Sequence, residues 1–340
     1  MSNAYRFSVA PMLDYTDRHF RVLMRQVSRQ CLLYTEMVVA RAVVHQSREG
    51  APQGRDERLK RLERLLGFDP EEKPLALQLG GDDPKELAAA AALAAEWGYD
   101  EVNLNVGCPS QKASQGHFGA CLMACPEQVA ECVAAMAGSS GLPITVKHRI
   151  GIDQWDDMAH LLRFVDTVAA AGAARFAVHA RKAWLEGLDP KDNRTIPPLR
   201  WDMVHQLKRD RPALLVELNG GLRSLAECQV HLGELDGVMV GRAAYQHPLR
   251  WSAVDRDLFA DPSRDPVKAS AVIRGVIPHA ERWCAQGGRL WAIARHLVHL
   301  VEGVKGARGW RATLSRQAGE RGASPEVLAR AALQLEERGL

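Results

Sequence analysis

Short apolar runs alternate with longer segments of helical periodicity through the first 250 residues. The apolar runs predict eight strands, at Phe7–Met12, Leu32–Val38, Leu75–Leu79, Glu101–Val106, Ile144–Arg149, Arg175–His179, Leu214–Leu218 and Gly237–Val240. The intervening segments predict helices at Asp17–Ser28, Arg55–Leu66, Pro84–Trp97, Pro126–Ala137, Asp156–Ala171, Trp201–Arg209 and Ser224–Leu232. This alternation favours a parallel (β/α)8 TIM barrel, with an open doubly wound sheet as the alternative.

The last quarter of the chain has a different pattern. Residues 261–266 predict a linker that is rich in proline and aspartate. Helical spacing without a convincing strand follows, at Val267–Cys284, Arg289–Gly303, Trp310–Gln317 and Pro325–Arg338. We therefore expect an α/β barrel domain at residues 1–255 and a small all-helical domain at residues 256–340.

Composition narrows the class of protein. The 340 residues are 46% hydrophobic and 25% charged, which is typical of a globular chain and excludes a wholly disordered one. No apolar run reaches the length of a membrane span and no secretory signal is predicted, so we expect a cytosolic protein. The seven cysteines include no Cys-x-x-Cys pair, so we expect reduced thiols and no metal.

Charge is distributed unevenly along the chain. The net charge is +3, but residues 264–340 carry +6 and the remainder carries −3. A basic helical region on a mildly acidic body is typical of a protein with a polyanionic partner such as nucleic acid. An ordinary solvated helical surface is the alternative explanation.

Polar residues follow the end of every predicted strand. In a barrel these ends converge on one face, where such folds place their active sites. Packing alone would explain some of them, because buried polar groups need hydrogen-bond partners. The strand-end residues Gln78, Asn105, Lys147 and His179 indicate polar groups around the edge of a flat cofactor. A lysine at such a place can form a Schiff base or stabilise negative charge, and an exposed strand-end lysine is the alternative.

Glycines after the last two strands predict an anion site. The pairs Gly220-Gly221 and Gly241-Arg242 follow the seventh and eighth strands, where barrels commonly bind phosphate. Tight turns are the alternative role for these glycines. No Gly-x-Gly-x-x-Gly motif follows the first strand, so a dedicated dinucleotide fold for NAD is not indicated.

Cys108 and two basic segments complete the candidate chemistry. Cys108 follows a strand between Gly107 and Pro109, where its thiol could act as an acid or nucleophile rather than as a small buried hydrophobe. The basic segments 179–194 and 306–311 interleave arginines with tryptophans. That combination is typical of surfaces that bind single-stranded RNA, and solvated surface arginines are the alternative.

Three motifs resemble the tRNA-dihydrouridine synthase family: Ala10-Pro-Met-Leu-Asp-Tyr-Thr-Asp17, Leu104-Asn-Val-Gly-Cys-Pro-Ser110 and Val146-Lys-His-Arg-Ile-Gly151. Further segments resemble its DusA branch, at residues 179–185, 193–198, 219–221 and 241–242. The resemblance covers nearly the whole chain. It implies a TIM barrel that binds FMN at its mouth and a helical domain that helps to hold tRNA.

The resemblance also assigns residues by position. It implies that the FMN contacts are Pro11, Met12, Gln78, Lys147, His179, Asn219, Gly220, Gly221, Gly241 and Arg242. Cys108 would be the catalytic proton donor. The implied tRNA contacts are Asn105, Lys191, Arg194, Arg308 and Arg311.

The implied reaction is reduction of the C5–C6 double bond of uridine at positions 20 and 20a of the tRNA D-loop. NADPH would reduce FMN, flavin N5 would give a hydride to C6, and Cys108 would give a proton to C5. No membrane, DNA or obligate protein partner is expected. Three rivals stay open: a flavin enzyme acting on a small dihydropyrimidine or dihydroorotate, a non-catalytic RNA-binding barrel, and a lysine-dependent aldolase.

Overall fold

Parallel strands form the centre of the molecule. The computed structural model describes residues 3–47 and 54–340. Their strands are β1 (Phe7–Val9), β2 (Leu33–Tyr34), β3 (Val38–Val39), β4 (Leu75–Gly80), β5 (Glu101–Val106), β6 (Ile144–Arg149), β7 (Arg175–His179), β8 (Val216–Asn219) and β9 (Gly237–Val240). They pair in the order β1-β9-β8-β7-β6-β5-β4-β2, and a parallel bridge between Ser8 and Leu32 joins the two ends of this series. The predicted barrel is confirmed and the open sheet is wrong.

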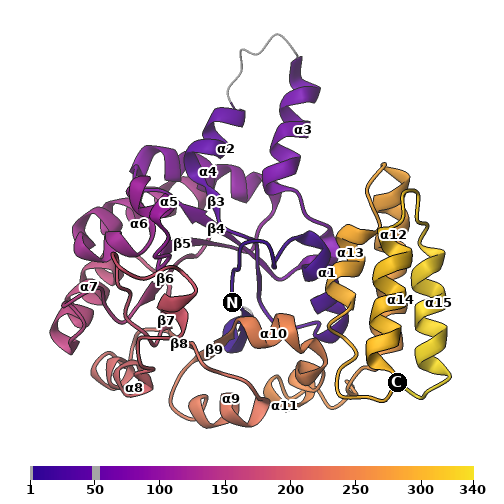
Figure 1. The fold of residues 1–340 in the computed structure, drawn as a ribbon. Coiled ribbons are helices and arrows are strands. Elements are labelled where there is room, and N and C mark those ends of the chain that lie inside the picture. The colour runs from indigo at the N-terminus through magenta and orange to yellow at the C-terminus, as the bar shows by residue number, and fades with distance from the viewer. Residues whose placement is uncertain (1–2, 48–53) are drawn as a thin grey trace.

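Helices surround the barrel, as Figure 1 shows. They are α1 (Arg18–Val27), α2 (Ala40–Ser47), α3 (Gly54–Leu66), α4 (Pro84–Trp97), α5 (Gln111–Gln115), α6 (Pro126–Ser140), α7 (Met158–Ala170), α8 (Trp201–Asp210), α9 (Leu225–His231), α10 (Arg242–Gln246) and α11 (Val254–Leu258). Acidic caps begin several of them: Asp83 accepts from two backbone N–H groups of α4, at 2.8 and 3.0 Å. The sequence pattern does not predict α2, α5, α10 and α11, of which α5, α10 and α11 have only five residues each.

The first two strands are shorter than predicted, for local reasons. The first ends at Val9 because Pro11 has no backbone N–H, and the Met12 N–H donates at 2.9 Å to the side chain of Thr16 instead of to a neighbouring strand. The second is interrupted between β2 and β3. There the Thr35 hydroxyl accepts from the Gln78 backbone N–H at 3.1 Å, in the place of a backbone carbonyl.

A chain of buried polar side chains occupies the barrel interior. At the amino-terminal ends of the strands, Arg175 pairs with Glu101 at 2.8 Å and with Glu217 at 3.4 Å. Thr145 donates to Glu101 at 2.6 Å and accepts from Asn103 at 2.8 Å. From there the chain continues toward the carboxyl ends, because Gln78 donates to Asn103 at 2.8 Å and accepts from Asn105 at 2.9 Å. The floor of the barrel is therefore connected to its mouth by hydrogen bonds.

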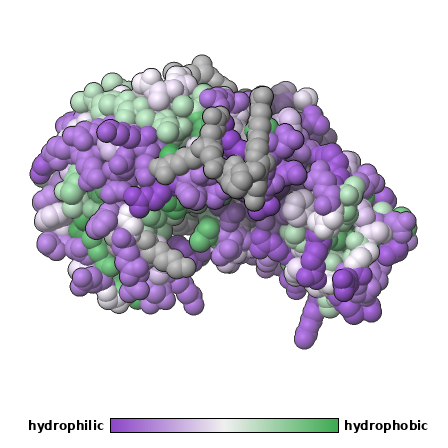
Figure 2. Space-filling view, turned by 90° about the horizontal axis from the view of Figure 1, so that it is seen from above, coloured by the Kyte–Doolittle hydropathy of each residue, from purple (hydrophilic) through white to green (hydrophobic). Residues whose placement is uncertain are grey.

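Four helices form the C-terminal lobe beside the barrel (Figure 1). They are α12 (Ala269–Ala285), α13 (Trp291–Leu297), α14 (Ala307–Gly319) and α15 (Glu326–Glu336). The lobe packs through α12 and α13 against α1 of the barrel. Its visible surface is mainly hydrophilic in Figure 2, where it is the smaller body on the right. In the part of the chain that the structure describes, no helix combines the length and the hydropathy that a membrane crossing requires.

Histidines line the contact between α1 and the C-terminal lobe. His19 Nδ1 lies 2.8 Å from His279 Nε2, and His279 Nδ1 lies 2.9 Å from the Asp69 carboxylate. Asp17, which caps α1, pairs with Arg295 at 2.7 Å and with His296 at 3.0 Å. Burial lowers the pKa of His19 to about 3, because the effect of nearby Asp17 only partly offsets it.

Acidification is expected to destabilise the fold between pH 6.5 and 4. Burial lowers the pKa of His148 to about 4. Like His19, His148 therefore stays neutral in the folded protein but takes up a proton in the unfolded chain. Because the unfolded state binds more protons, the free energy of unfolding decreases as the pH decreases. For each histidine the decrease is about 1.4 kcal/mol per pH unit. Urea unfolding at pH 7 and pH 5 checks this. His148→Gln should weaken the dependence and His45→Gln, at an exposed position, should not; equal stability at both pH values would contradict the prediction.

Candidate active site

The carboxyl ends of β4 to β8 bring the predicted cofactor residues together. The strand register places Asn105 beside Lys147 and His179 beside Asn219. Lys147 Nζ donates to Asn219 Oδ1 at 3.1 Å, and Asn219 Nδ2 donates to the Met239 carbonyl at 2.8 Å. The side chain of Asn219 on β8 is therefore oriented by the neighbouring strand β9, and it holds the lysine of β6.

Lys147 is a half-buried ammonium beside a neutral amide. Burial lowers the pKa of Lys147 to about 8 and the charge of Arg149 lowers it further, whereas Glu217 and Cys108 oppose this change. Within residues 3–47 and 54–340, no carboxylate lies within ion-pair distance of its Nζ atom. An anionic group placed beside Lys147 would stabilise the charged form.

Two glycines allow the loop after β8 to lie against its neighbours. Gly220 has a φ of +108°, and a Cβ there would lie 2.5 Å from Cδ2 of His179. Gly221 has a φ of +85°, and a Cβ there would lie 2.5 Å from the side chain of Leu199. Trp201 Nε1 donates to the Gly220 carbonyl at 2.9 Å and orients the loop. Any side chain at Gly220 would displace the imidazole of His179.

Gly241 is under no such constraint. A Cβ at Gly241 would be 3.7 Å from its nearest neighbours, which is ordinary contact. Arg242 follows it and begins α10, which has only five residues. The guanidinium of Arg242 is therefore the main cationic group at this strand end.

The loop that carries Cys108 is held in place by Asn105. The Asn105 Oδ1 atom accepts from the backbone N–H groups of Gly107 and Cys108, at 3.1 and 3.0 Å. The Cys108 carbonyl accepts from the Ala120 N–H at 2.8 Å, and its half-buried thiol lies 3.4 Å from the Ser110 hydroxyl. Asn105 Nδ2 donates one hydrogen to Gln78 and retains a second for a ligand.

Arg149 links three segments of the mouth, a role that the sequence analysis does not assign. Its Nε donates to the Gly107 carbonyl at 2.9 Å, next to Cys108. Its NH1 donates to the carbonyls of Lys182 and Asn193, at 2.9 and 3.0 Å. The sequence does contain an indication of this role: Arg149 comes two residues after Lys147, and this spacing places both side chains on one face of β6.

Basic side chains gather around this site. Electrostatic interactions connect Lys147, Arg149, Arg181, Arg194, Arg223 and Arg242. Burial lowers the pKa of His179 far below its usual range, and four of these cations lower it further. Among residues 3–47 and 54–340, none of the six forms a salt bridge with a carboxylate. The mouth is therefore an electropositive region whose cations have no direct carboxylate partner among the described residues.

The predicted RNA contacts lie in three places: Asn105 on β5, Lys191 and Arg194 after β7, and Arg308 and Arg311 on α14. Lys191 and Arg194 are exposed on the loop after β7, and Arg242 NH2 donates to the Arg194 carbonyl at 3.4 Å. The buried Asn193 holds this loop through hydrogen bonds with both backbone groups of Trp184, at 2.8 and 2.9 Å.

In the C-terminal lobe the prediction is partly wrong. Arg308 is exposed and Arg311 half-buried on α14, as RNA contact requires. Trp310, between them, is only 3% exposed and donates to the Ala331 carbonyl at 3.2 Å, so its ring cannot stack on a base. Trp184 differs, because its ring is 38% exposed and carries Lys182 Nζ at 4.2 Å.

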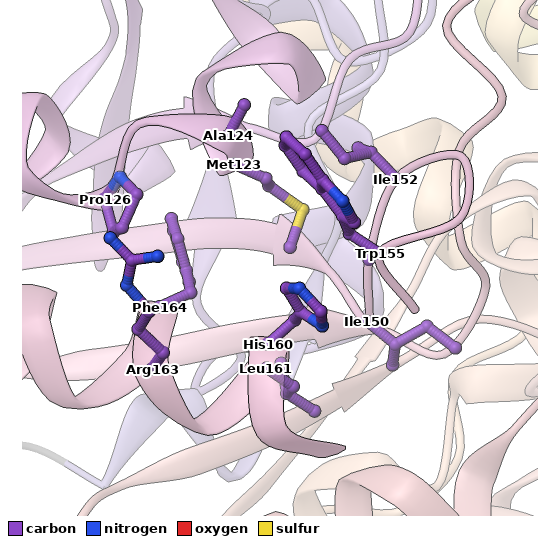
Figure 3. A pocket seen from close by; sticks show the side chains of 11 residues that line it. Met123, Ala124, Pro126, Ile150, Ile152, Trp155, His160, Leu161, Arg163 and Phe164 are labelled. Carbon is purple, nitrogen blue, oxygen red and sulfur yellow. The ribbon is translucent and has the colours of Figure 1, made fainter. Parts of the chain in front are cut away.

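A cavity of about 180 Å³ lies outside the ring of strand ends, between α6, α7 and the segment after β6. Figure 3 shows the side chains of Met123, Trp155, His160 and Phe164 around it. The rings of Trp155 and His160 stack with centroids 6.0 Å apart. No predicted cofactor or RNA residue lines this cavity.

Comparison with known proteins agrees with this arrangement. Residues 8–336 match the family model described as "Dihydrouridine synthase (Dus)". A protein of Synechocystis sp. named tRNA-dihydrouridine(20/20a) synthase is 52% identical, over 94% of this chain and 92% of its own. Proteins of the same name from Shewanella oneidensis and Escherichia coli K12 are 52% and 50% identical, over 95% of this chain and 91% and 89% of theirs. This chain belongs to the dihydrouridine synthase family and is an oxidoreductase.

Proposed function

We propose that this enzyme reduces the C5–C6 double bond of uridine at positions 20 and 20a of the tRNA D-loop, with FMN as cofactor and NADPH as reductant. One observation carries the proposal: Lys147 and five arginines, none paired with a carboxylate among the described residues, form one connected cationic cluster, in which Lys147 and Arg149 also interact with Cys108. Such a mouth suits a phosphate-bearing cofactor and a polyanionic substrate together. The names of the relatives support tRNA as the substrate.

The residues present fit FMN. Gly220 allows the backbone to approach the His179 ring where a Cβ would collide, so the imidazole keeps its place at the mouth. The half-buried Lys147 has a neutral amide as its hydrogen-bond partner, so it can accept a negatively charged neighbour. The proposed contacts are Pro11, Met12, Gln78, Lys147, His179, Asn219, Gly220, Gly221, Gly241 and Arg242.

Cys108 would supply the proton. When bound and reduced by NADPH, FMN supplies a hydride to C6 of uracil. The Cys108 thiol would protonate C5, from a loop whose backbone Asn105 and Arg149 hold rigid. Lys147, at the strand end beside Asn105, would stabilise the negative charge that develops during the reaction.

The RNA would extend from the mouth toward the C-terminal lobe. Asn105, Lys191 and Arg194 at the mouth, and Arg308 and Arg311 on α14, are the proposed tRNA contacts. The target uridine must leave its stack to reach the strand ends, so loop RNA is the suitable form of substrate. We propose that residues 1–255 form the catalytic domain and residues 256–340 the tRNA-binding domain.

An absorbance experiment tests the proposal. The purified protein, reconstituted with FMN if needed, is mixed anaerobically with NADPH and then with unmodified tRNA. Bleaching by NADPH and reoxidation by tRNA, but not by uracil or a dihydroorotate precursor, is the expected result. Reoxidation by the small molecules alone would favour the small-molecule flavin enzyme, and a protein that binds no FMN would refute the flavin assignment.

Removal of a cation from α14 is expected to weaken tRNA binding and its dependence on salt. The logarithm of the binding constant falls linearly with the logarithm of the salt concentration. Each phosphate contact that is lost makes this slope less steep by about one, because fewer counterions are released. Arg308→Ala and Arg311→Ala should show this in binding titrations at several salt concentrations. Arg330→Ala, on α15 and paired with Glu326 at 3.8 Å, is the control. An unchanged slope in both α14 variants would show that α14 does not contact phosphate.

A further inference from the structure

The loop between β1 and α1 presents two large apolar side chains to solvent. Leu13 is 66% exposed and Tyr15 is 43% exposed. Single exposed apolar residues are ordinary on protein surfaces. Two of them within three residues, directly after the proposed FMN contact Met12, indicate a contact surface at the barrel mouth.

Several backbone groups of this loop form hydrogen bonds. The N–H groups of Tyr15 and Thr16 donate to the Met12 carbonyl, at 3.1 and 3.0 Å, and the Thr16 hydroxyl accepts from the Met12 N–H at 2.9 Å. Asp14 has a φ of +67°, and its carbonyl accepts from Arg295 of α13 at 3.0 Å. The exposed side chains are therefore presented in one fixed arrangement, which lowers the entropic cost of binding a ligand.

Tyr15 lies between the cofactor region and the C-terminal lobe. Its ring centroid is 4.4 Å from that of Tyr245, which is buried and supports it from one side. Tyr245 belongs to α10, which begins with Arg242, and the guanidinium of Arg242 lies in the neighbourhood of Tyr15. On its other side, Tyr245 lies 4.8 Å from the ring of His299, and the charge of Arg311 interacts with His299. A line of aromatic rings thus runs from the mouth to the lobe, with an arginine near each end.

We propose that Tyr15 stacks on the unpaired RNA base next to the target uridine. This inference rests on the proposed function. When a uridine leaves its stack, the neighbouring base loses one stacking partner, and that loss is part of the cost of extrusion. The ring of Tyr15 replaces that partner, while Arg242 and Arg311 are placed to neutralise phosphates on either side. Leu13 adds apolar contact beside it.

Fluorescence tests the stacking directly. Two unmodified tRNA transcripts carry 2-aminopurine immediately before or immediately after the target uridine, because stacking quenches this base. The wild-type enzyme should quench one of the two transcripts on binding. Tyr15→Ala and Tyr15→Leu should lose that quenching and bind tRNA about ten- to a hundredfold more weakly, and Tyr15→Phe should retain both properties. Tyr15→Leu keeps apolar packing on Tyr245, so it separates stacking from loop stability.

Leu333→Ala, at an apolar position on α15 that is 50% exposed, is the matched control and should bind like the wild type. Quenching and affinity within twofold of the wild type in both Tyr15→Ala and Tyr15→Leu would overturn the proposal. Equal weakening by Tyr15→Phe would also overturn it, because that change preserves the ring. Failure of the proposed function gives a different result, since the wild-type flavin would then not be reoxidised by tRNA.

Discussion

Replacing Cys108 by alanine is expected to abolish reduction of uridine in tRNA while leaving FMN bound and reducible by NADPH. The thiol is the proposed proton donor to C5, and general acid catalysis of this kind contributes about 10²–10⁴-fold to the rate. The backbone around Cys108 is fixed by Asn105, Arg149 and Ala120, so removal of the sulfur should leave the loop in place. Single-turnover reoxidation of the reduced flavin by tRNA measures the loss.

Cys125→Ala provides the matched control, because Cys125 is an exposed free cysteine. It should reduce tRNA at the wild-type rate. Normal reoxidation by Cys108→Ala would mean that another group donates the proton. Loss of NADPH-dependent flavin reduction in the same variant would assign Cys108 to the cofactor site instead.

Replacing Arg175 by alanine is expected to produce the largest loss of stability. Arg175 is 4% exposed and lies between two buried carboxylates, Glu101 at 2.8 Å and Glu217 at 3.4 Å. Its removal leaves both without their cation, and breaking a buried pair in this way costs about 3–5 kcal/mol. Urea unfolding measures the change.

The pH dependence of this variant gives a second readout. Burial already raises the pKa of Glu217 although Arg175 opposes the rise, so without Arg175 the folded protein should hold a proton on Glu217 to higher pH. Because its folded state then binds more protons than the unfolded chain, the variant should lose stability relative to the wild type as pH rises from 5 to 8. Arg274→Ala is the control, since Arg274 forms an exposed pair with Glu336 and should matter far less. A loss no larger than that of the control would refute the buried pair as a stabilising element.

The sequence by itself predicted the barrel and the residues that gather at its mouth. The strands β5, β6, β7 and β9 have the predicted bounds, although β5 and β6 alternate apolar residues with polar ones. Their carboxyl ends must converge once the barrel closes, and for this reason Gln78, Asn105, Lys147 and His179 could be grouped before their contacts were known. Family motifs then supplied the cofactor and the substrate as expectations.

Contacts between distant segments were decided only by the tertiary structure. Trp310 looked like an RNA-stacking residue beside two arginines, but α15 covers it, and nothing in the local sequence reveals a partner twenty-one residues away. Arg149 on β6 donates to the carbonyls of Gly107, after β5, and Asn193, after β7. Arg295, in the C-terminal lobe, donates to the Asp14 carbonyl of the β1–α1 loop. Periodicity records which face of an element is buried, whereas the partner on that face depends on how the elements pack.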